Sequence, residues 1–322
     1  MTGPGKNAGA GGEQARRTVE IEDFTNLYFI HPVSARLVPV FARAGITPNM
    51  VSLFGMACGV FAGACYFFYR NTGCAIAGFV LMLAWHVMDG ADGQLARLTR
   101  SYSDFGKVLD GICDYVTFAA VYAGLGLALV PVFGGWVCAV ILFSGICHAV
   151  QSAAYEVQRQ SYDFWGKGRQ SAAPPSLAAP AAAPPVPARG AMRRVAVELN
   201  RIYARVQLWA AGNDSFGARF AAIMAAHPGR EAMLRAEYRA HFAPLVRRWG
   251  ILSANYRTLG IFIAALLRLP LLYFLFEIAG FSLILLVLLR AQKTANAEFL
   301  RQIGQAERRR EPLMPAIQQP SA

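Results

Sequence analysis

The stretch "MDGADGQLARLTRSYSDFGKVLDGICDY", residues 88–115, decides the fold, because it sets charged residues between two long apolar segments. It contains five aspartates, Asp89, Asp92, Asp104, Asp110 and Asp114. The apolar segments on either side are typical of membrane-spanning helices, where carboxylates are costly and mostly functional. The arrangement therefore raises the question of what these side chains bind at the edge of a membrane.

The composition of the whole chain indicates a membrane protein. Of the 322 residues, 55% are hydrophobic and only 16% are charged, which is too apolar for an ordinary soluble domain. The formal net charge of +12 fits basic residues that lie in cytoplasmic loops or near anionic headgroups. No basic motif interleaved with aromatic residues is present, so we expect no nucleic-acid partner.

Apolar runs predict an all-α integral membrane protein with six transmembrane helices. The predicted spans are residues 50–69, 74–90, 107–129, 136–154, 251–268 and 271–290. Turn sequences at Arg70–Gly73 and Arg268–Pro270 separate two pairs of spans. Residues 32–45 mix apolar side chains with Arg36 and Arg43, so we expect an N-terminal amphipathic helix in the membrane interface.

A long insert separates the fourth span from the fifth. Residues 171–190 contain six prolines and eight alanines, a composition typical of a linker. Residues 191–250 contain ten Arg, no Lys and four acidic residues. They predict two or three amphipathic helices that lie on the inner membrane face or cover the site. A solvated helical insert without a role in the chemistry is the alternative.

These features divide the chain into five parts. Residues 1–29 have no apolar core of a signal peptide and are expected to be a flexible cytoplasmic lead. Residues 30–155 hold the interfacial helix, the first four spans and the aspartates. The insert covers residues 156–250, the last two spans lie in 251–290, and residues 291–322 are expected to be a cytoplasmic tail.

The basic residues predict the orientation in the membrane. With the N-terminus in the cytoplasm, the outer loops carry only Arg70 and Arg268, whereas the inner segments carry nearly all other basic residues. Both termini and the aspartates then lie on the cytoplasmic side. None of the six cysteines has metal-ligand spacing, so we interpret them as small buried hydrophobic residues.

Four of the aspartates have helical spacing. Asp89 and Asp92 are three residues apart, and Asp110 and Asp114 are four apart, so each pair projects from one helix face. A short link folds the two helices antiparallel, which brings four mutually repelling carboxylates together. Mg²⁺, Mn²⁺ or Ca²⁺ suit such oxygen ligands, and a pair of ions serves phosphoryl-type displacements. One such aspartate alone is more often a helix cap, but four are hard to explain in that way.

The residues beside these aspartates suit a phosphate-containing ligand. Gly93 and Gly106 leave room for a close approach, and Ala96 keeps one helix face small. Arg97 supplies a guanidinium for a phosphate. Carboxylates for metal and an arginine for phosphate together point to a metal-bridged diphosphate substrate.

Other polar residues near the aspartates have simpler interpretations. Asp104 or Ser103 is expected to cap the third span, or Asp104 to face solvent. For His86 and His148 we expect a supporting hydrogen bond or packing rather than catalysis.

The aspartate stretch resembles the CDP-alcohol phosphotransferase (CDP-alcohol phosphatidyltransferase) motif, D-x2-D-G-x2-A-R-x8-G-x3-D-x3-D. Every fixed position is present without a gap: Asp89, Asp92, Gly93, Ala96, Arg97, Gly106, Asp110 and Asp114. The resemblance extends to the layout of residues 30–155 and 251–290. It does not cover the insert, which is larger than we expect for that family.

The resemblance implies a phospholipid-synthesising enzyme in a membrane, most simply a bacterial inner membrane. Members of the family transfer a substituted phosphate from a CDP-linked donor, usually CDP-diacylglycerol, to an alcohol hydroxyl and release CMP. It implies that two divalent cations, Mg²⁺ or Mn²⁺, lie among Asp89, Asp92, Asp110 and Asp114. Asp114 would be the general base, and Gly93, Ala96, Arg97 and Gly106 would line the CDP site.

The sequence leaves more than one possibility for the acceptor and for the donor. We favour a polyol or a polyol phosphate such as inositol phosphate or glycerol phosphate, because Arg159, Lys167 and Arg169 could bind its phosphate. With Tyr155 and Tyr162, these residues could instead be headgroup anchors. An amino-alcohol acceptor, or a CDP-amino-alcohol donor with diacylglycerol as acceptor, is the alternative within the family. An ion-coupled transporter is the alternative outside it. The oligomeric state, including a homodimer, is not determined by the sequence.

Overall fold

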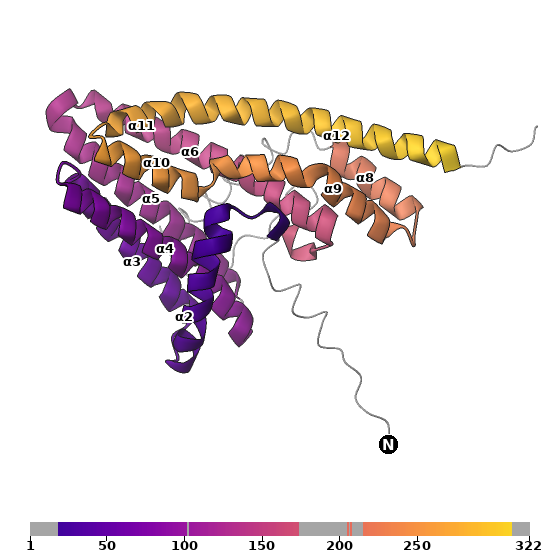
Figure 1. The fold of residues 1–322 in the computed structure, drawn as a ribbon, viewed down its shortest axis with the longest axis horizontal. Coiled ribbons are helices and arrows are strands. Elements are labelled where there is room, and N and C mark those ends of the chain that lie inside the picture. Colours follow the sequence, from indigo (N-terminus) through magenta and orange to yellow (C-terminus); the bar gives the residue numbers. More distant parts are fainter. Residues whose placement is uncertain (1–18, 102, 174–204, 206, 208–214, 311–322) are drawn as a thin grey trace, which may run out of the picture.

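The computed structural model describes residues 19–101, 103–173, 205, 207 and 215–310. All regular structure in these residues is helical, which confirms the predicted all-α class (Figure 1). The longer helices are α2 (His31–Arg43), α3 (Pro48–Phe67), α4 (Thr72–Thr99), α5 (Asp104–Phe133), α6 (Trp136–Ser161), α8 (Ser215–Ala226), α9 (Glu231–Trp249), α10 (Ala254–Leu266), α11 (Pro270–Phe276) and α12 (Ser282–Arg310). Short 3₁₀ or π turns are η1 (Val19–Ile21), η2 (Asn26–Ile30), η3 (Tyr162–Gly166), η4 (Gln170–Ala172), η5 (Gly250–Leu252) and η6 (Glu277–Phe281).

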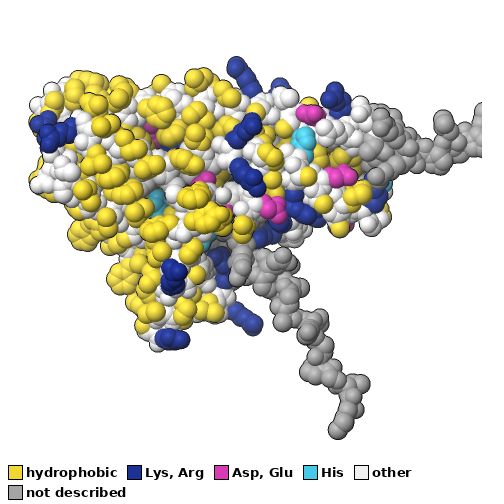
Figure 2. Space-filling model, viewed as in Figure 1, with side chains coloured by type: hydrophobic (Ala, Val, Ile, Leu, Met, Phe, Trp, Pro, Cys, Tyr) yellow, Lys and Arg dark blue, Asp and Glu magenta, His cyan; other side chains and the backbone are white. Residues whose placement is uncertain are grey.

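Five helical segments among the described residues are long and apolar enough to cross a membrane. They are Pro48–Phe67, Thr72–Thr99, Leu109–Phe133, Trp136–Gly166 and Pro270–Gln305. Figure 2 shows apolar side chains over most of the surface formed by these helices. The predicted span 251–268 contains α10, which has 13 residues and is therefore about 20 Å long. Because a hydrocarbon core is about 30 Å thick, the count of six spans stays a prediction.

Glycines let α3 approach α5 closely. α3 packs against both α4 and α5. A Cβ at Gly59 would overlap the side chain of Thr117, and a Cβ at Gly124 would overlap the carbonyl oxygen of Gly63. Small residues at a helix interface allow this backbone contact in a membrane, where packing rather than the hydrophobic effect holds helices together. The close contact fixes the position of α5, which carries Asp110 and Asp114 of the motif.

Gly124→Ala is therefore expected to destabilise the helix bundle. The added methyl group meets backbone that cannot move aside, and overpacking of this kind costs about 1–3 kcal/mol. Gly111→Ala is the matched control on the same helix, because nothing lies within 4 Å of a Cβ there. Thermal unfolding in detergent should show a lower melting temperature for Gly124→Ala alone, and equal values for both variants would contradict this packing.

The predicted interfacial helix corresponds to α2. Ser34 of α2 is buried and donates a hydrogen bond to the backbone oxygen of Val87 on α4 at 2.7 Å. Gly90 makes room for it, since a Cβ there would lie 2.8 Å from the Ser34 hydroxyl. Pro39 lies inside α2 on its exposed side. In Figure 1, α2 crosses the direction of α3 and α4, as a helix lying in an interface would.

The described part of the insert packs on α12. α8 and α9 form an aromatic core with η3 and the last turns of α12, and no residue of α4 or α5 belongs to it. The members include Phe216, Phe220, Tyr238, Phe242, Trp165, Phe299 and Ile303. Two amphipathic helices are thus present, but they lie along α12 rather than over the aspartates (Figure 1).

Three predicted span ends fall well short of the helix ends in the structure, and the first is residue 90, since α4 continues to Thr99. α12 continues 20 residues past the predicted span end at residue 290, because Phe299 and Ile303 pack into the aromatic core of the insert. α6 continues past residue 154 into η3, whose carbonyl groups accept hydrogen bonds from Arg235 and Arg239 of α9. Of the predicted flexible lead 1–29, residues 19–29 include η1 and most of η2, so this part is ordered by its packing, with Ile21 buried. Residues 1–18, most of the linker 171–190 and the tail beyond residue 310 lie outside the described residues.

The structure agrees with the predicted turn near residue 269 and only partly with the predicted burial of the cysteines. The predicted turn at Arg268–Pro270 is confirmed, since Arg268 has φ 59° and Pro270 begins α11. The six cysteines are free, as expected, but only Cys113 is buried. The interpretation as buried residues is wrong for Cys138, because the beginning of α6 exposes it on the outer surface of the bundle.

Candidate active site

A tight hairpin between α4 and α5 brings the two halves of the aspartate motif together. Arg100 ends α4 in the left-handed conformation, with φ 53°. Ser103 caps α5, because its hydroxyl accepts a hydrogen bond from the backbone N–H of Gly106 at 2.9 Å. The cap is therefore Ser103 and not Asp104, which is the first residue of α5 and stands apart from the other four aspartates in sequence.

The structure brings all four predicted metal ligands to one pocket. Carboxylate oxygens of Asp89, Asp92 and Asp110 lie within 4.8 Å of one another. Together with Asp114, they line a pocket that also contains Ser52, Gly55, Trp85 and Cys113. We call this the acidic pocket. Carboxylates so close repel one another unless cations lie between them, and oxygen ligands of this kind suit Mg²⁺ or Mn²⁺.

Ser52 of α3 fixes one of the carboxylates. Its hydroxyl donates to Oδ2 of Asp92 at 2.5 Å, and both residues are buried. Partners of this kind orient metal-binding carboxylates and set their basicity. Asn49, one turn earlier on α3, lies beside the start of α5: its Oδ1 would be 3.3 Å from a Cβ at Gly106.

The sequence prediction did not include Ser52 or Asn49. The apolar pattern places Ser52 inside the first predicted span, 50–69, and Asn49 directly before it. A useful indication was available, since Asn49 and Ser52 are three residues apart on one face of an otherwise apolar helix. Polar residues aligned in this way inside a membrane helix indicate a functional face.

Ser52→Ala is expected to lower activity and to weaken metal binding, each by about tenfold, in line with the loss of other outer partners of metal ligands. Thr117→Val is the control, because the Thr117 hydroxyl is buried and has no hydrogen-bond partner among the described residues. Mn²⁺ titrations of both variants measure the effect. A Ser52→Ala variant with the Mn²⁺ affinity of the control would rule out this role.

The residues predicted for the CDP site lie beside the acidic pocket rather than in its lining. Gly93, Ala96 and Arg97 follow Asp92 along α4, and Gly106 lies across the hairpin near the start of α5. The Arg97 guanidinium covers Gly93, with Nη1 3.6 Å from the position that a Cβ would take. A cation thus lies one helical turn beyond Asp92 and Gly93, and a guanidinium is a strong binder of phosphate oxygens.

The two histidines do not contact the aspartates through any observed hydrogen bond. Nε2 of His86 lies 2.9 Å from the hydroxyl of Thr258 on α10. Nδ1 of His148 lies 3.0 Å from the Tyr122 hydroxyl and 3.7 Å from Oε1 of Glu277. Both are therefore parts of the packing between helices, as the sequence favoured.

The cations in the last turn of α6 and just after it are engaged by acidic residues. Arg159 binds Glu156 through two hydrogen bonds of 2.6 and 2.8 Å, and Arg169 binds Asp163 at 3.0 Å. Lys167 forms an ion pair with Glu20. Burial acts to raise the pKa of Glu20, but hydrogen bonds from Lys167 and from Tyr162, which donates at 2.5 Å, outweigh it, so this pKa is lowered. The contacts of Glu20 with Lys167 and Tyr162 tie the N-terminal segment to the insert.

Comparison with known proteins places this geometry in a family. The model of the CDP-alcohol phosphatidyltransferase family matches residues 45–225. A phosphatidylinositol phosphate synthase of Mycobacteroides abscessus is 38% identical over 89 residues, which are 28% of this chain and 39% of the relative. The inner membrane protein YnjF of Escherichia coli is 31% identical over 139 residues, 41% of this chain and 65% of the relative.

The relatives are matched over parts of their length. A phosphatidylinositol phosphate synthase of Mycobacterium tuberculosis is 36% identical over 83 residues, 26% of this chain and 37% of the relative. The chain thus spans between 37% and 65% of the length of these three relatives. The family match is broader, since it covers more than half of the chain and includes α3, the hairpin and the whole acidic pocket. On that match the chain belongs to the CDP-alcohol phosphatidyltransferase family.

Proposed function

We propose that this protein is a phospholipid-synthesising phosphotransferase that moves a phosphatidyl group from CDP-diacylglycerol to an alcohol and releases CMP. The observation that carries the proposal is the acidic pocket, in which aspartates of α4 and α5 face one another. Family membership supports this chemistry and argues against an ion-coupled transporter.

Two divalent ions, Mg²⁺ or Mn²⁺, are proposed to bind Asp89, Asp92, Asp110 and Asp114. The carboxylates of α4, of which Asp92 is buried and Asp89 half-buried, and the facing carboxylates of α5 fit such ions, because hard cations prefer oxygen ligands. When bound, the ions would offset the charge of the diphosphate and the charge that grows on the departing CMP. Ser52 keeps Asp92 oriented toward them.

The side chains of the pocket supply the proton transfer and the positioning. As the acceptor oxygen bonds to the phosphatidyl phosphorus, Asp114 takes the hydroxyl proton, and the bond from that phosphorus to the CMP oxygen breaks. An aspartate with an ordinary pKa of about 4 is a weak base, so orientation of the reactants supplies much of the rate. Arg97 binds a phosphate of the donor, and Gly93, Ala96 and Gly106 leave room for the CDP moiety.

The acceptor that we propose is a polyol phosphate such as inositol phosphate. Support comes from the names of the mycobacterial relatives. The contacts of Arg159, Lys167 and Arg169 favour a second candidate, an acceptor without a phosphate such as an amino alcohol, because acidic partners already neutralise these cations.

The protein is proposed to span a bacterial inner membrane with both termini and the acidic pocket on the cytoplasmic side. The distribution of basic residues supports this orientation, and the name of the Escherichia coli relative supports the location. A homodimer is the oligomeric state to test, by light scattering of the purified protein.

Purified protein in nanodiscs should release CMP from labelled CDP-diacylglycerol only when Mg²⁺ or Mn²⁺ and a suitable alcohol are present. The panel contains inositol phosphate, glycerol phosphate, inositol, glycerol, serine and ethanolamine, and the lipid product is identified by mass. A separate arm offers CDP-choline or CDP-ethanolamine with diacylglycerol. Release of CMP in the separate arm alone would replace the proposed donor, and no release in any arm would refute the transferase proposal.

A further inference from the structure

A fully buried ion pair holds the C-terminal helices to the rest of the bundle. Arg257 of α10 and Glu277 at the start of η6 are both 0% exposed and form an ion pair through Nη1 and Oε1. Glu277 also accepts hydrogen bonds from Tyr122 of α5 at 2.5 Å, Ser144 of α6 and Tyr273 of α11 at 3.3 Å. We call these five residues the buried polar network.

The backbone of η6 takes part as well. Gln151 of α6 accepts a hydrogen bond from Arg257 at 3.0 Å and donates to the backbone oxygen of Glu277 at 3.1 Å. The Arg257 guanidinium lies 4.9 Å from the centre of the Phe281 ring. Charged groups inside a membrane helix are costly and are mostly functional, and π turns such as η6 are common at functional sites.

The network does not line the acidic pocket, but the residue next to Arg257 on α10 is hydrogen-bonded to α4. Thr258 follows Arg257 directly on α10, and its hydroxyl lies 2.9 Å from Nε2 of His86. Both side chains are buried. His86 precedes Asp89 by three residues on the same face of α4, so the hydrogen bond restrains the helical turn from which this aspartate projects.

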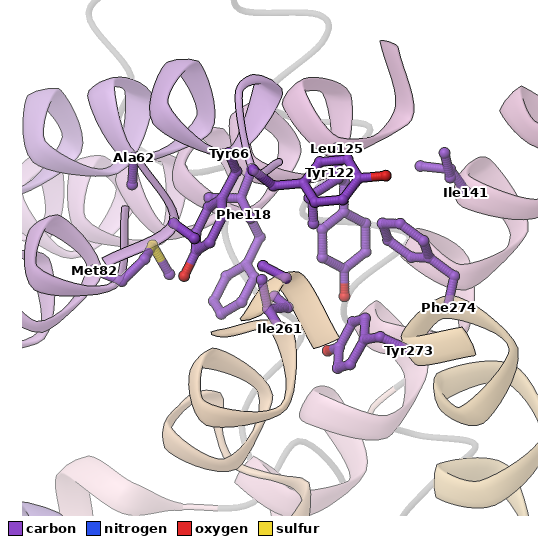
Figure 3. Packing of buried hydrophobic residues seen from close by; sticks show 14 of the residues in the cluster. Ala62, Tyr66, Met82, Phe118, Tyr122, Leu125, Ile141, Ile261, Tyr273 and Phe274 are labelled. Carbon is purple, nitrogen blue, oxygen red and sulfur yellow. The ribbon is translucent and has the colours of Figure 1, made fainter. Parts of the chain in front are cut away.

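A series of aromatic contacts leads to the same turn. The ring of Tyr122 lies 6.2 Å from that of Phe118, which lies 5.4 Å from that of Trp85, both in edge-on geometry. Tyr122, Phe118 and Tyr273 lie together in the core shown in Figure 3. The Trp85 ring lies at a tilt beside that of His86, with the centroids 4.4 Å apart, and Trp85 lines the acidic pocket. Both routes therefore end at residues 85 and 86.

We infer that the buried polar network positions the α4 half of the metal site, with Thr258 and Tyr122 as positioning residues that act through His86 and Trp85. Asp89 and Asp92 of α4 have to face Asp110 and Asp114 of α5 at a fixed separation for one set of ions to bind all of them. The hydrogen bonds and the ion pair of Glu277 tie α10, α11 and η6 to α5 and α6, and the two routes transmit that position to α4. This inference rests on the proposed metal site.

Two variants that preserve side-chain shape test the inference. Thr258→Val removes the hydroxyl that reaches His86, and Tyr122→Phe removes the hydroxyl that reaches Glu277. Each has a matched control that removes a buried hydroxyl without a hydrogen-bond partner among the described residues, Thr117→Val and Tyr66→Phe respectively. Thr258→Ser restores the hydroxyl and serves as the rescue.

The readout is equilibrium binding of Mn²⁺ to the purified full-length protein, followed by electron paramagnetic resonance of the free ion. Thr258→Val and Tyr122→Phe are expected to raise the Kd for Mn²⁺ about threefold to tenfold. This effect is smaller than the loss of metal affinity of about 10–100-fold that follows mutation of a direct partner of a metal ligand. The controls and Thr258→Ser should stay within about twofold of the unmodified protein, and kcat at saturating Mn²⁺ should fall with the affinity.

The possible outcomes separate this inference from the proposed function. Unchanged Mn²⁺ affinity in both test variants, with or without a loss of thermal stability, would show that the network only holds the fold together. An unmodified protein that binds Mn²⁺ but releases no CMP would refute the transferase proposal and leave the positioning role measurable by binding. An unmodified protein that binds no Mn²⁺ would overturn both.

Discussion

Asp110→Asn is expected to abolish phosphatidyl transfer while the protein stays folded. The change keeps the size of the side chain but removes the negative charge of one of three carboxylates that lie within 4.8 Å. A hard divalent cation loses a ligand, so the loss of activity should exceed the factor of about 100 that marks the upper range for outer partners. CMP release at saturating Mn²⁺ measures it.

The stability of metal-free Asp110→Asn should rise, although its activity falls. The unmodified acidic pocket brings like charges together, so removal of one charge relieves repulsion and should raise the melting temperature of metal-free protein. Added Mn²⁺ stabilises a protein that binds it in the folded state, and this gain should be lost in Asp110→Asn. A metal-induced gain equal to that of the unmodified protein would exclude Asp110 as a ligand.

Asp104→Asn is the matched control for both measurements. It makes the same chemical change on the same helix, at an aspartate that stands outside the motif. Activity and metal-induced stabilisation should be those of the unmodified protein. A control that lost activity as completely as Asp110→Asn would show that net charge near the hairpin, rather than ligation, governs the reaction.

Most of the fold could be predicted because helices in a membrane satisfy their own backbone hydrogen bonds. Apolar runs therefore located α3, α4, α5 and α6 to within a few residues at most ends. The extension of α12 could not be predicted from such runs, since it depends on contacts between Phe299 and residues of α8 and α9 far away in sequence. Pattern alone also does not show that η5 and a turn at Ser253 shorten α10.

The site shows the same division between local and long-range information. The spacing of Asp89 and Asp92, and of Asp110 and Asp114, is local, so convergence followed from helix periodicity and a short link. The hydrogen bond from Ser52 to Asp92 joins residues 40 apart, and the helix packing that makes it depends on glycines of α3. The sequence shows each basic residue in and after the last turn of α6, but it does not show the acidic partner of each. The structure therefore does not support the prediction that these residues bind an acceptor phosphate.

The largest stability effect is expected at the ion pair of Arg257 and Glu277, two charges that lie in otherwise apolar segments of the sequence. Arg257→Met leaves the carboxylate of Glu277 buried without its cation, and loss of one partner from a buried pair costs about 3–5 kcal/mol. Glu277→Gln leaves the guanidinium in the same position. Each single variant should therefore unfold at markedly lower temperature or SDS concentration.

The double variant Arg257→Met, Glu277→Gln should be more stable than either single variant. It buries no net charge, and replacement of a whole buried pair by uncharged residues is often close to neutral, because the desolvation cost of both ions disappears as well. A double-mutant cycle in one detergent separates the coupling between the two side chains from their individual effects. Additive losses would mean that the two charges are stabilised independently.

The pair of Glu156 and Arg159 provides the control cycle. It joins the same two charge types on α6, but both side chains are about one quarter exposed, at 27% and 28%. Water screens such a pair, and its coupling should be no more than about 1 kcal/mol. If the buried pair shows no greater coupling than this one, solvent or lipid headgroups must reach Arg257 and Glu277. Their contacts could then not hold α10 and α11 at one fixed distance from α5.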